Sequence, residues 1–133
     1  MDYLELVQKA KEASKKSYSP YSRFPVGAAL LTKSGKVFTG CNVENASFGL
    51  TICAERTAIY KAVSEGETEF LALAVFCTAA EYCTPCGACR QVINEFGSDI
   101  DVIMSNAAGD YTVKKSAELL PGAFALMKRK AGQ

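Results

Sequence analysis

The segment Phe70-Leu71-Ala72-Leu73-Ala74-Val75-Phe76-Cys77-Thr78 is a continuous apolar run. Its length and its β-branched and aromatic residues are typical of a β-strand that is buried on both faces. Such a strand belongs in the middle of a sheet, with other strands on either side of it. The segment therefore predicts that the chain folds around a sheet with covered faces.

Further strands are expected before and after this apolar run. Residues 26–32 and 36–43 flank a Lys-Ser-Gly turn signal and predict a β-hairpin. Residues 101–105 and 111–114 predict two more short strands. With the apolar run, these segments make five strands, and their alternation with helices predicts a mixed sheet.

Helices are expected between the strands. Residues 1–17 repeat apolar side chains at spacings of three and four and stop at Ser19-Pro20, which predicts an amphipathic helix. Later helices are expected at residues 53–64, 86–96 and 116–120, with a final short helix after residue 122. The sequence thus predicts a single α/β domain over residues 1–133, a layered fold whose five-stranded mixed sheet is packed between helices.

The composition fits one globular domain and restricts its ligands. Apolar residues make up 49% of the 133 residues, which is enough for one hydrophobic core. Lys plus Arg (15) nearly balances Asp plus Glu (14), and this balance argues against a nucleic-acid polymer as partner, since phosphates need a basic face. Histidine is missing from the sequence, so any metal must be held by sulfur or oxygen.

Six cysteines in a short chain would suit the disulfide framework of a secreted protein. Residues 1–10, however, are acidic and amphipathic and lack the apolar run of a signal peptide, and no segment has the apolar length of a membrane span. We therefore expect a soluble cytoplasmic protein with reduced thiols. Cys41 and Cys77, inside predicted strands, are expected to be small apolar core residues.

Two short motifs carry the chemistry. Cys53-Ala54-Glu55 is followed later in the chain by Pro85-Cys86-Gly87-Ala88-Cys89. The thiolates of Cys53, Cys86 and Cys89 can hold one zinc ion and leave its fourth tetrahedral position open. Glu55 can then move protons to and from whatever occupies that position. Both motifs are predicted to begin helices, whose N-terminal N–H groups favour thiolates.

Other residues near these motifs affect the charge of the predicted zinc site and the number of its ligands. Three thiolates leave a Zn²⁺ site negative, and Arg56 is expected to offset that charge by hydrogen bonding to the sulfurs, with Arg90 as a second candidate. Cys83 could supply a fourth sulfur, which would make a structural zinc site. We favour the catalytic interpretation because Pro85 precedes Cys86, as in the Pro-Cys-x-x-Cys signature of zinc-dependent nucleobase deaminases.

Three further stretches extend this resemblance over nearly the whole chain. They are YSRFPVGAAL at residues 21–30, GCNVENAS at 40–47 and ELLPGAF at 118–124, and they resemble the small bacterial-type cytidine deaminases. The resemblance implies a cytidine-deaminase-like fold, one Zn²⁺ per subunit and a homotetramer with shared active sites. It also implies hydrolytic deamination of cytidine and 2′-deoxycytidine to uridine and 2′-deoxyuridine plus ammonia, in pyrimidine salvage.

The resemblance also implies the substrate contacts. Phe24 would pack against the pyrimidine, Ala54 would contact the substrate, and Phe124 would arrive from another subunit. Asn42 and Glu44 would hydrogen-bond the ribose hydroxyl groups. The residues themselves agree with this pair, because Asn42 and Glu44 alternate at the end of a predicted strand and are expected on one face, as one wall of the pocket.

Two alternatives remain open from the sequence. The first is a related aminohydrolase that acts on another cytosine nucleoside, such as a nucleoside antibiotic. Phe48 stands where many members of the family carry Tyr, so any hydroxyl contact made there is missing. The second is a non-catalytic protein with a structural Cys₄ zinc site that includes Cys83, in which four sulfurs would leave no position for water.

Overall fold

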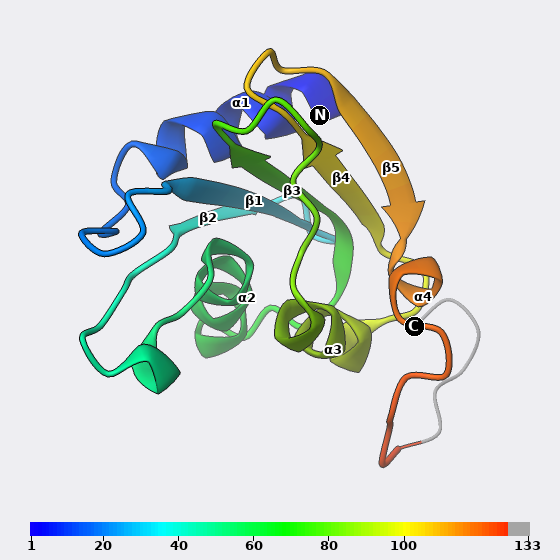
Figure 1. Cartoon of the computed structure of the whole chain (residues 1–133). Helices are drawn as coiled ribbons and strands as arrows, with labels where there is room; N and C mark the ends of the chain where they lie inside the picture. The colour runs from blue at the N-terminus through cyan, green and yellow to red at the C-terminus, as the bar shows by residue number, and fades with distance from the viewer. Residues whose placement is uncertain (128–133) are drawn as a thin grey trace.

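The centre of the molecule is a five-stranded sheet with the strand order β2-β1-β3-β4-β5 (Figure 1). The computed structural model describes residues 1–127. Its strands are β1 (Val26–Thr32), β2 (Val37–Cys41), β3 (Phe70–Cys77), β4 (Asp101–Ser105) and β5 (Tyr111–Lys115). β3 and β4 are parallel, whereas the other neighbouring pairs are antiparallel, so the predicted mixed sheet is confirmed.

The apolar run forms the middle strand, β3. Every residue of β3 except Leu71 is buried. Within the sheet, Ala74 of β3 lies opposite Ala29 of β1 on one side and Ile103 of β4 on the other. A strand with neighbours on both edges and cover on both faces has little contact with water, and this explains why its sequence shows no polar alternation.

Helices cover both faces of the sheet (Figure 1). α1 (Tyr3–Ser14) packs on one face, and α2 (Ala54–Ser64) and α3 (Gly87–Phe96) pack on the other. Each face has its own cluster of buried apolar side chains, one formed with α1 and the other with α2 and α3. The 3₁₀ helix η1 (Phe48–Leu50) and the short helix α4 (Ser116–Leu119) complete the described elements. The predicted layered α/β fold is thus confirmed.

Gly40 allows α2 to lie close against the edge strand β2. A Cβ atom at this position would stand 2.6 Å from the backbone nitrogen of Ala58 and 2.7 Å from the carbonyl oxygen of Ala54. A side chain of any size would therefore push α2 away from the sheet. α2 begins directly after Cys53 and contains Glu55. The close packing of α2 against β2 at Gly40 therefore determines where both residues lie relative to β1 and β3.

The structure differs from the prediction at the ends of some elements. The second strand ends at Cys41 instead of residue 43, because Val43 leaves the sheet and pairs with Tyr18 and Ile52 through isolated bridges. The final short helix predicted after residue 122 is not formed over residues 123–127. The rest of that prediction lies outside the described residues.

Among residues 1–127, none of the helices combines the length and the apolar character that crossing a membrane requires.

Candidate active site

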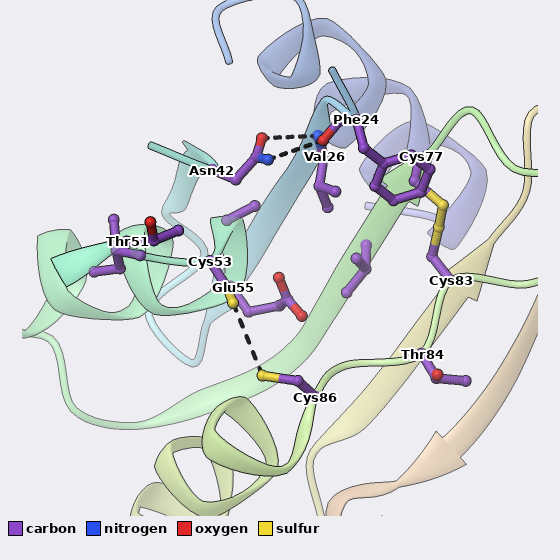
Figure 2. Close-up of a pocket in the computed structure, with 13 residues that line it drawn as sticks. Phe24, Val26, Asn42, Thr51, Cys53, Glu55, Cys77, Cys83, Thr84 and Cys86 are labelled. Carbon is purple, nitrogen blue, oxygen red and sulfur yellow. Dashed lines mark hydrogen bonds between the residues drawn. A yellow bond between two sulfur atoms is a disulfide. The ribbon is translucent and has the colours of Figure 1, made fainter. Parts of the chain in front are cut away.

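Three predicted metal ligands come together at the start of α2 and α3. The Sγ atoms of Cys53, Cys86 and Cys89 all lie within 4.8 Å of one another. The Sγ atoms of Cys53 and Cys86 are 3.8 Å apart (Figure 2). Zn–S bonds of about 2.3 Å at tetrahedral angles separate two ligand sulfurs by about 3.8 Å. The three cysteines therefore fit a zinc ion, and their predicted convergence is confirmed.

The ligands occupy the N-terminal ends of their helices. Cys53 is the N-cap residue of α2 and Cys86 is the N-cap residue of α3, with Cys89 one turn further on. The first hydrogen bonds of the two helices run from Thr57 N to Cys53 O at 3.1 Å and from Arg90 N to Cys86 O at 2.9 Å. Free N–H groups and the positive end of the helix dipole favour the thiolate form of each ligand.

Arg56 brings a positive charge to the sulfurs. Its Nη2 atom donates a hydrogen bond to Sγ of Cys53 at 3.4 Å. The pKa of Cys53 is lowered to about 5, mainly by a hydrogen bond from Cys89 and to a smaller extent by the guanidinium of Arg56. The pKa of Cys89 is raised, because this thiol keeps the proton that it shares with Cys53. Arg56 thus lies where it can stabilise a negatively charged sulfur cluster.

Glu55 places a buried carboxyl group beside the cluster. The residue is only 4% exposed, and its side chain points into the space next to Cys53 (Figure 2). Burial, and to a smaller extent the negative charge of Cys53, raise the pKa of Glu55 to about 7, although hydrogen bonds oppose the shift. A carboxyl group with a pKa near neutrality can both accept and return a proton.

A cavity of about 340 Å³ lies over these groups. Cys53, Glu55 and Cys86 lie on one side of it, and Phe24 lies on another (Figure 2). Its volume is within the range of small-molecule sites, and its wall is mainly apolar with a few polar groups, as such sites require. The cavity can hold a small planar ring next to the carboxyl group of Glu55.

Cys77 and Cys83 form a disulfide in the wall of this cavity (Figure 2). The expectation of reduced thiols is therefore wrong for Cys77 and Cys83, whereas Cys77 is a buried core residue of β3, as expected. The loop after β3 returns to the end of β4, where Cys83 N donates a hydrogen bond to Ser105 O at 2.9 Å, and its Sγ atom is bonded to that of Cys77. A bonded Cys83 does not supply a fourth zinc ligand, so the structural Cys₄ alternative is contradicted as well.

Asn42 lies at the cavity and holds the segment that enters β1. Its Oδ1 atom accepts a hydrogen bond from Val26 N at 2.9 Å, and its Nδ2 atom donates to Phe24 O at 2.9 Å (Figure 2). Oδ1 also accepts a hydrogen bond from Ser17 Oγ at 2.5 Å. Asn42 is 9% exposed, whereas Phe24 is 42% exposed. The amide of Asn42 therefore determines how the backbone presents Phe24 to the cavity.

Glu44 lines a second cavity instead of the same wall as Asn42. This cavity, of about 370 Å³, is lined by Tyr21, Ser22, Glu44, Phe48 and Thr51, and Thr51 also lines the first cavity. β2 ends at Cys41, before both residues, and Asn42 and Glu44 flank Val43, which forms isolated bridges with Tyr18 and Ile52. The two cavities adjoin at Thr51.

Ala54 and Phe124 occupy very different positions. Ala54 is fully buried and lines the first cavity. Phe124 is 68% exposed and lines another cavity, of about 460 Å³, with Asn94 among its neighbours. Its carbonyl oxygen accepts a hydrogen bond from Gln91 Nε2 at 3.0 Å. Phe124 therefore does not line the first cavity of its own chain, and its role in another subunit stays a prediction.

Two contacts around the site were not found by sequence reasoning. Arg90, the second candidate for the sulfurs, instead donates to Pro85 O and to Leu119 O, both at 2.8 Å, and so braces the loop before α3. Ser22 donates a hydrogen bond from its hydroxyl to Glu44. The contacts of Arg90 with Leu119 and of Ser22 with Glu44 have no sequence signal, because each joins residues that only the fold brings together.

Comparisons with known proteins agree with this site. The family model for the "Cytidine and deoxycytidylate deaminase zinc-binding region" matches residues 2–105. The chain is 50% identical over 125 residues to a cytidine deaminase of Sporosarcina psychrophila, covering 93% of this chain and 92% of the relative. It is 51% identical over 125 residues to a cytidine deaminase of Halalkalibacterium halodurans, covering 93% and 95%.

A solved structure supports the same assignment for the whole fold. The crystal structure of a cytidine deaminase from Burkholderia pseudomallei matches with a TM-score of 0.91 and 50% sequence identity. The match covers 93% of this chain and 100% of that one. Sequence, fold and the arrangement of the three cysteines with Glu55 agree, and the chain belongs to the zinc-binding family of cytidine and deoxycytidylate deaminases.

Proposed function

We propose that the chain catalyses the hydrolytic deamination of cytidine, and of 2′-deoxycytidine, in pyrimidine salvage. The observation that carries the proposal is the buried carboxyl group of Glu55 beside the sulfurs of Cys53, Cys86 and Cys89, at a cavity of small-molecule size. The names of the relatives at about 50% identity support it. In the reaction, water adds its oxygen to C4 of the base and the amino group leaves as ammonia.

Glu55 is the proposed proton carrier. Zinc held by Cys53, Cys86 and Cys89 supplies the Lewis acidity that makes water nucleophilic near neutral pH. The carboxylate of Glu55 takes a proton from water and gives a proton to N3 of the cytosine ring. It then carries a second proton to the departing amino group, and the raised pKa of this carboxyl group suits both directions of transfer.

Phe24 and Asn42 are the proposed contacts to the base and the sugar, together with the backbone of Ala54. Half-exposed Phe24 offers an aromatic surface at the cavity. A side-chain amide has two N–H donors, and in the described part of the chain one N–H of Asn42 is used by Phe24 O. The other N–H can bind a ribose hydroxyl group.

Glu44 is the proposed partner of a second ribose hydroxyl group. Its cavity adjoins the first one at Thr51, so a nucleoside with its base beside Glu55 can extend its sugar toward Glu44. A carboxylate and an amide that are positioned for hydroxyl groups discriminate against ligands without them, because their polar atoms would be left unpaired. This arrangement favours a nucleoside over free cytosine.

We also propose that the enzyme is a cytoplasmic homotetramer. Support comes from large apolar side chains that are exposed in the isolated chain, including Phe48 at 76% and Phe124 at 68%. Burial of such side chains against other subunits would remove apolar surface from water. Phe124 would then contribute to the active site of a neighbouring subunit.

The proposal is tested by following the ultraviolet absorbance of cytidine with purified, zinc-loaded protein. Glu55→Gln should retain zinc and lose activity by roughly 10²- to 10⁴-fold, the usual contribution of a general acid–base group. Glu65→Gln, at the other end of α2, is the matched control and should have the activity of the unmodified protein. Folded protein with full zinc content that does not convert cytidine would contradict the proposal and direct the search to modified cytosine nucleosides.

A further inference from the structure

Ser22 connects two of the proposed substrate contacts. Its hydroxyl donates a hydrogen bond to Oε2 of Glu44 and accepts one from the backbone N–H of Phe24 at 3.1 Å. A serine hydroxyl carries a single proton. Because the N–H of Phe24 approaches the oxygen itself, the proton of Ser22 is left to point at Glu44.

The carboxylate of Glu44 is held by the loop before β1 through both of its oxygens. Oε1 accepts hydrogen bonds from Tyr21 N at 2.9 Å and from Ser22 N at 3.1 Å, while the Ser22 hydroxyl holds Oε2. The Ser22 hydroxyl is the main cause that keeps the pKa of Glu44 below its usual range, and the two backbone bonds add to it. Glu44 therefore presents an ionised acceptor in a defined orientation.

The same hydroxyl closes a tight turn in this loop. Arg23 has a φ of 53°, in the left-handed region that side chains disfavour. The hydrogen bond from Phe24 N to Ser22 Oγ spans Arg23, and the bond from Arg23 N to Ser19 O at 2.9 Å supports the turn from the other side. The orientation of the Ser22 hydroxyl is thus tied to the backbone that carries Phe24.

We propose that Ser22 is a positioning residue for the sugar of the substrate, acting through the carboxylate of Glu44. The inference rests on the sugar contact proposed for Glu44. Without the Ser22 hydroxyl, Oε2 of Glu44 loses its partner and the carboxylate gains rotational freedom, which substrate binding must then remove. The hydroxyl of Ser22 contributes to the affinity for sugar hydroxyl groups and leaves the proton transfers at Glu55 unchanged.

The test compares cytidine with 2′,3′-dideoxycytidine, which lacks the 2′- and 3′-hydroxyl groups of the sugar. Ser22→Ala should raise KM for cytidine about fivefold, the effect of one lost hydrogen bond, while kcat and zinc content stay unchanged. KM for 2′,3′-dideoxycytidine should stay the same in this variant. Ser22→Thr retains a hydroxyl group and should restore KM for cytidine.

Ser34→Ala is the matched control. Ser34 Oγ donates to Glu67 Oε1 at 2.8 Å, so this variant also removes a serine–glutamate hydrogen bond, but in the turn between β1 and β2. It should leave KM for both substrates unchanged. An unchanged KM for cytidine in Ser22→Ala, or an equal rise for both substrates, would overturn the proposal, and so would a failure of Ser22→Thr to restore KM.

Glu44→Ala separates this inference from the proposed function. If Glu44→Ala leaves KM for cytidine unchanged, the proposed sugar contact is wrong and the role of Ser22 is overturned with it, while the deaminase activity itself stands. If Glu44→Ala raises KM for cytidine and Ser22→Ala does not, only the inference about Ser22 is wrong. A raised KM in both variants, with no further rise in the double variant, supports the inference, because the two residues then act as a unit.

Discussion

The Sγ atoms of Cys53 and Cys86 lie 3.8 Å apart, although 33 residues separate them in the sequence. This distance is the separation expected of two sulfur ligands in a tetrahedral zinc site. It arises because the N-terminal ends of α2 and α3 meet on one side of the sheet, at the cavity that contains Glu55. The fold thus brings these two sulfurs to the separation that zinc ligands require.

The ligand set predicts how zinc content responds to cysteine substitutions. Cys86→Ser should lose most of its zinc, because a serine hydroxyl is a much weaker zinc ligand than a thiolate. Cys83→Ser should retain about one zinc per subunit, since a catalytic zinc site has three protein ligands and Cys83 is bonded to Cys77. Metal analysis of the purified variants measures both. Loss of zinc from Cys83→Ser alone would contradict this ligand set.

The disulfide predicts the number of free thiols. In denaturant with a chelator and without reductant, a thiol reagent should modify four cysteines: Cys41, Cys53, Cys86 and Cys89. After reduction, it should modify all six cysteines of the chain. Peptide mapping should locate the two additional thiols at Cys77 and Cys83. Six reactive thiols before reduction would show that the bridge does not form in the purified protein.

Gly40→Ala tests the contact between α2 and the sheet. The added Cβ would lie 2.6 Å from Ala58 N, so α2 must shift and the free energy of unfolding should fall by about 2 kcal/mol. Activity should fall too, because α2 carries Glu55. Gly49→Ala is the control, since a Cβ there meets no atom within 4 Å. Urea unfolding of both variants measures the difference, and equal stability would refute the close contact.

Tyr3 predicts a stability change at alkaline pH. Its hydroxyl donates to Asp101, and this hydrogen bond raises the pKa of Tyr3 from 10.0 to about 12. The folded protein holds the proton more tightly than the unfolded chain, so the contribution of Tyr3 to stability is complete below pH 10 and is lost as the pH rises through 12. Asp101 in turn binds Lys115 at 2.7 Å.

Tyr3→Phe removes this contribution. At neutral pH the variant should be less stable by about 1 kcal/mol, because it lacks a hydrogen bond that is only partly buried. Above pH 10 the two stabilities should approach each other. Tyr60→Phe, on the exposed side of α2, is the control. A difference that stays constant up to pH 12 would mean that the hydroxyl of Tyr3 is not coupled to Asp101.

Phe124→Ala tests the shared active site. If Phe124 reaches the substrate of a neighbouring subunit, its truncation should raise KM for cytidine several-fold without loss of zinc. Leu4→Ala, which also truncates an exposed apolar residue, is the control for surface changes. Sedimentation of both variants reports on the assembly. An unchanged KM for Phe124→Ala would indicate that this residue packs only within its own chain.

Local sequence patterns were sufficient to predict most of the helices and strands and the chemical groups of the candidate site. The apolar run of β3 predicts a strand with both faces covered, and the spacing of Cys53 with Glu55 and of Cys86 with Cys89 predicts two helix starts with their ligands. These predictions succeed because burial, helix capping and ligand spacing act over a few residues and leave a signature in the sequence.

Only the tertiary structure decided which of these groups meet. It bonds Cys83 to Cys77, moves Glu44 into a second cavity away from Asn42, and turns Ser22 toward Glu44. Each of these contacts depends on where a loop returns to the sheet, and loop paths are set by many weak interactions between residues far apart in sequence. The sequence by itself therefore determined the layered fold and the residues that we propose as metal ligands and proton carrier, whereas the packing of the loops decided the shape of the proposed substrate site.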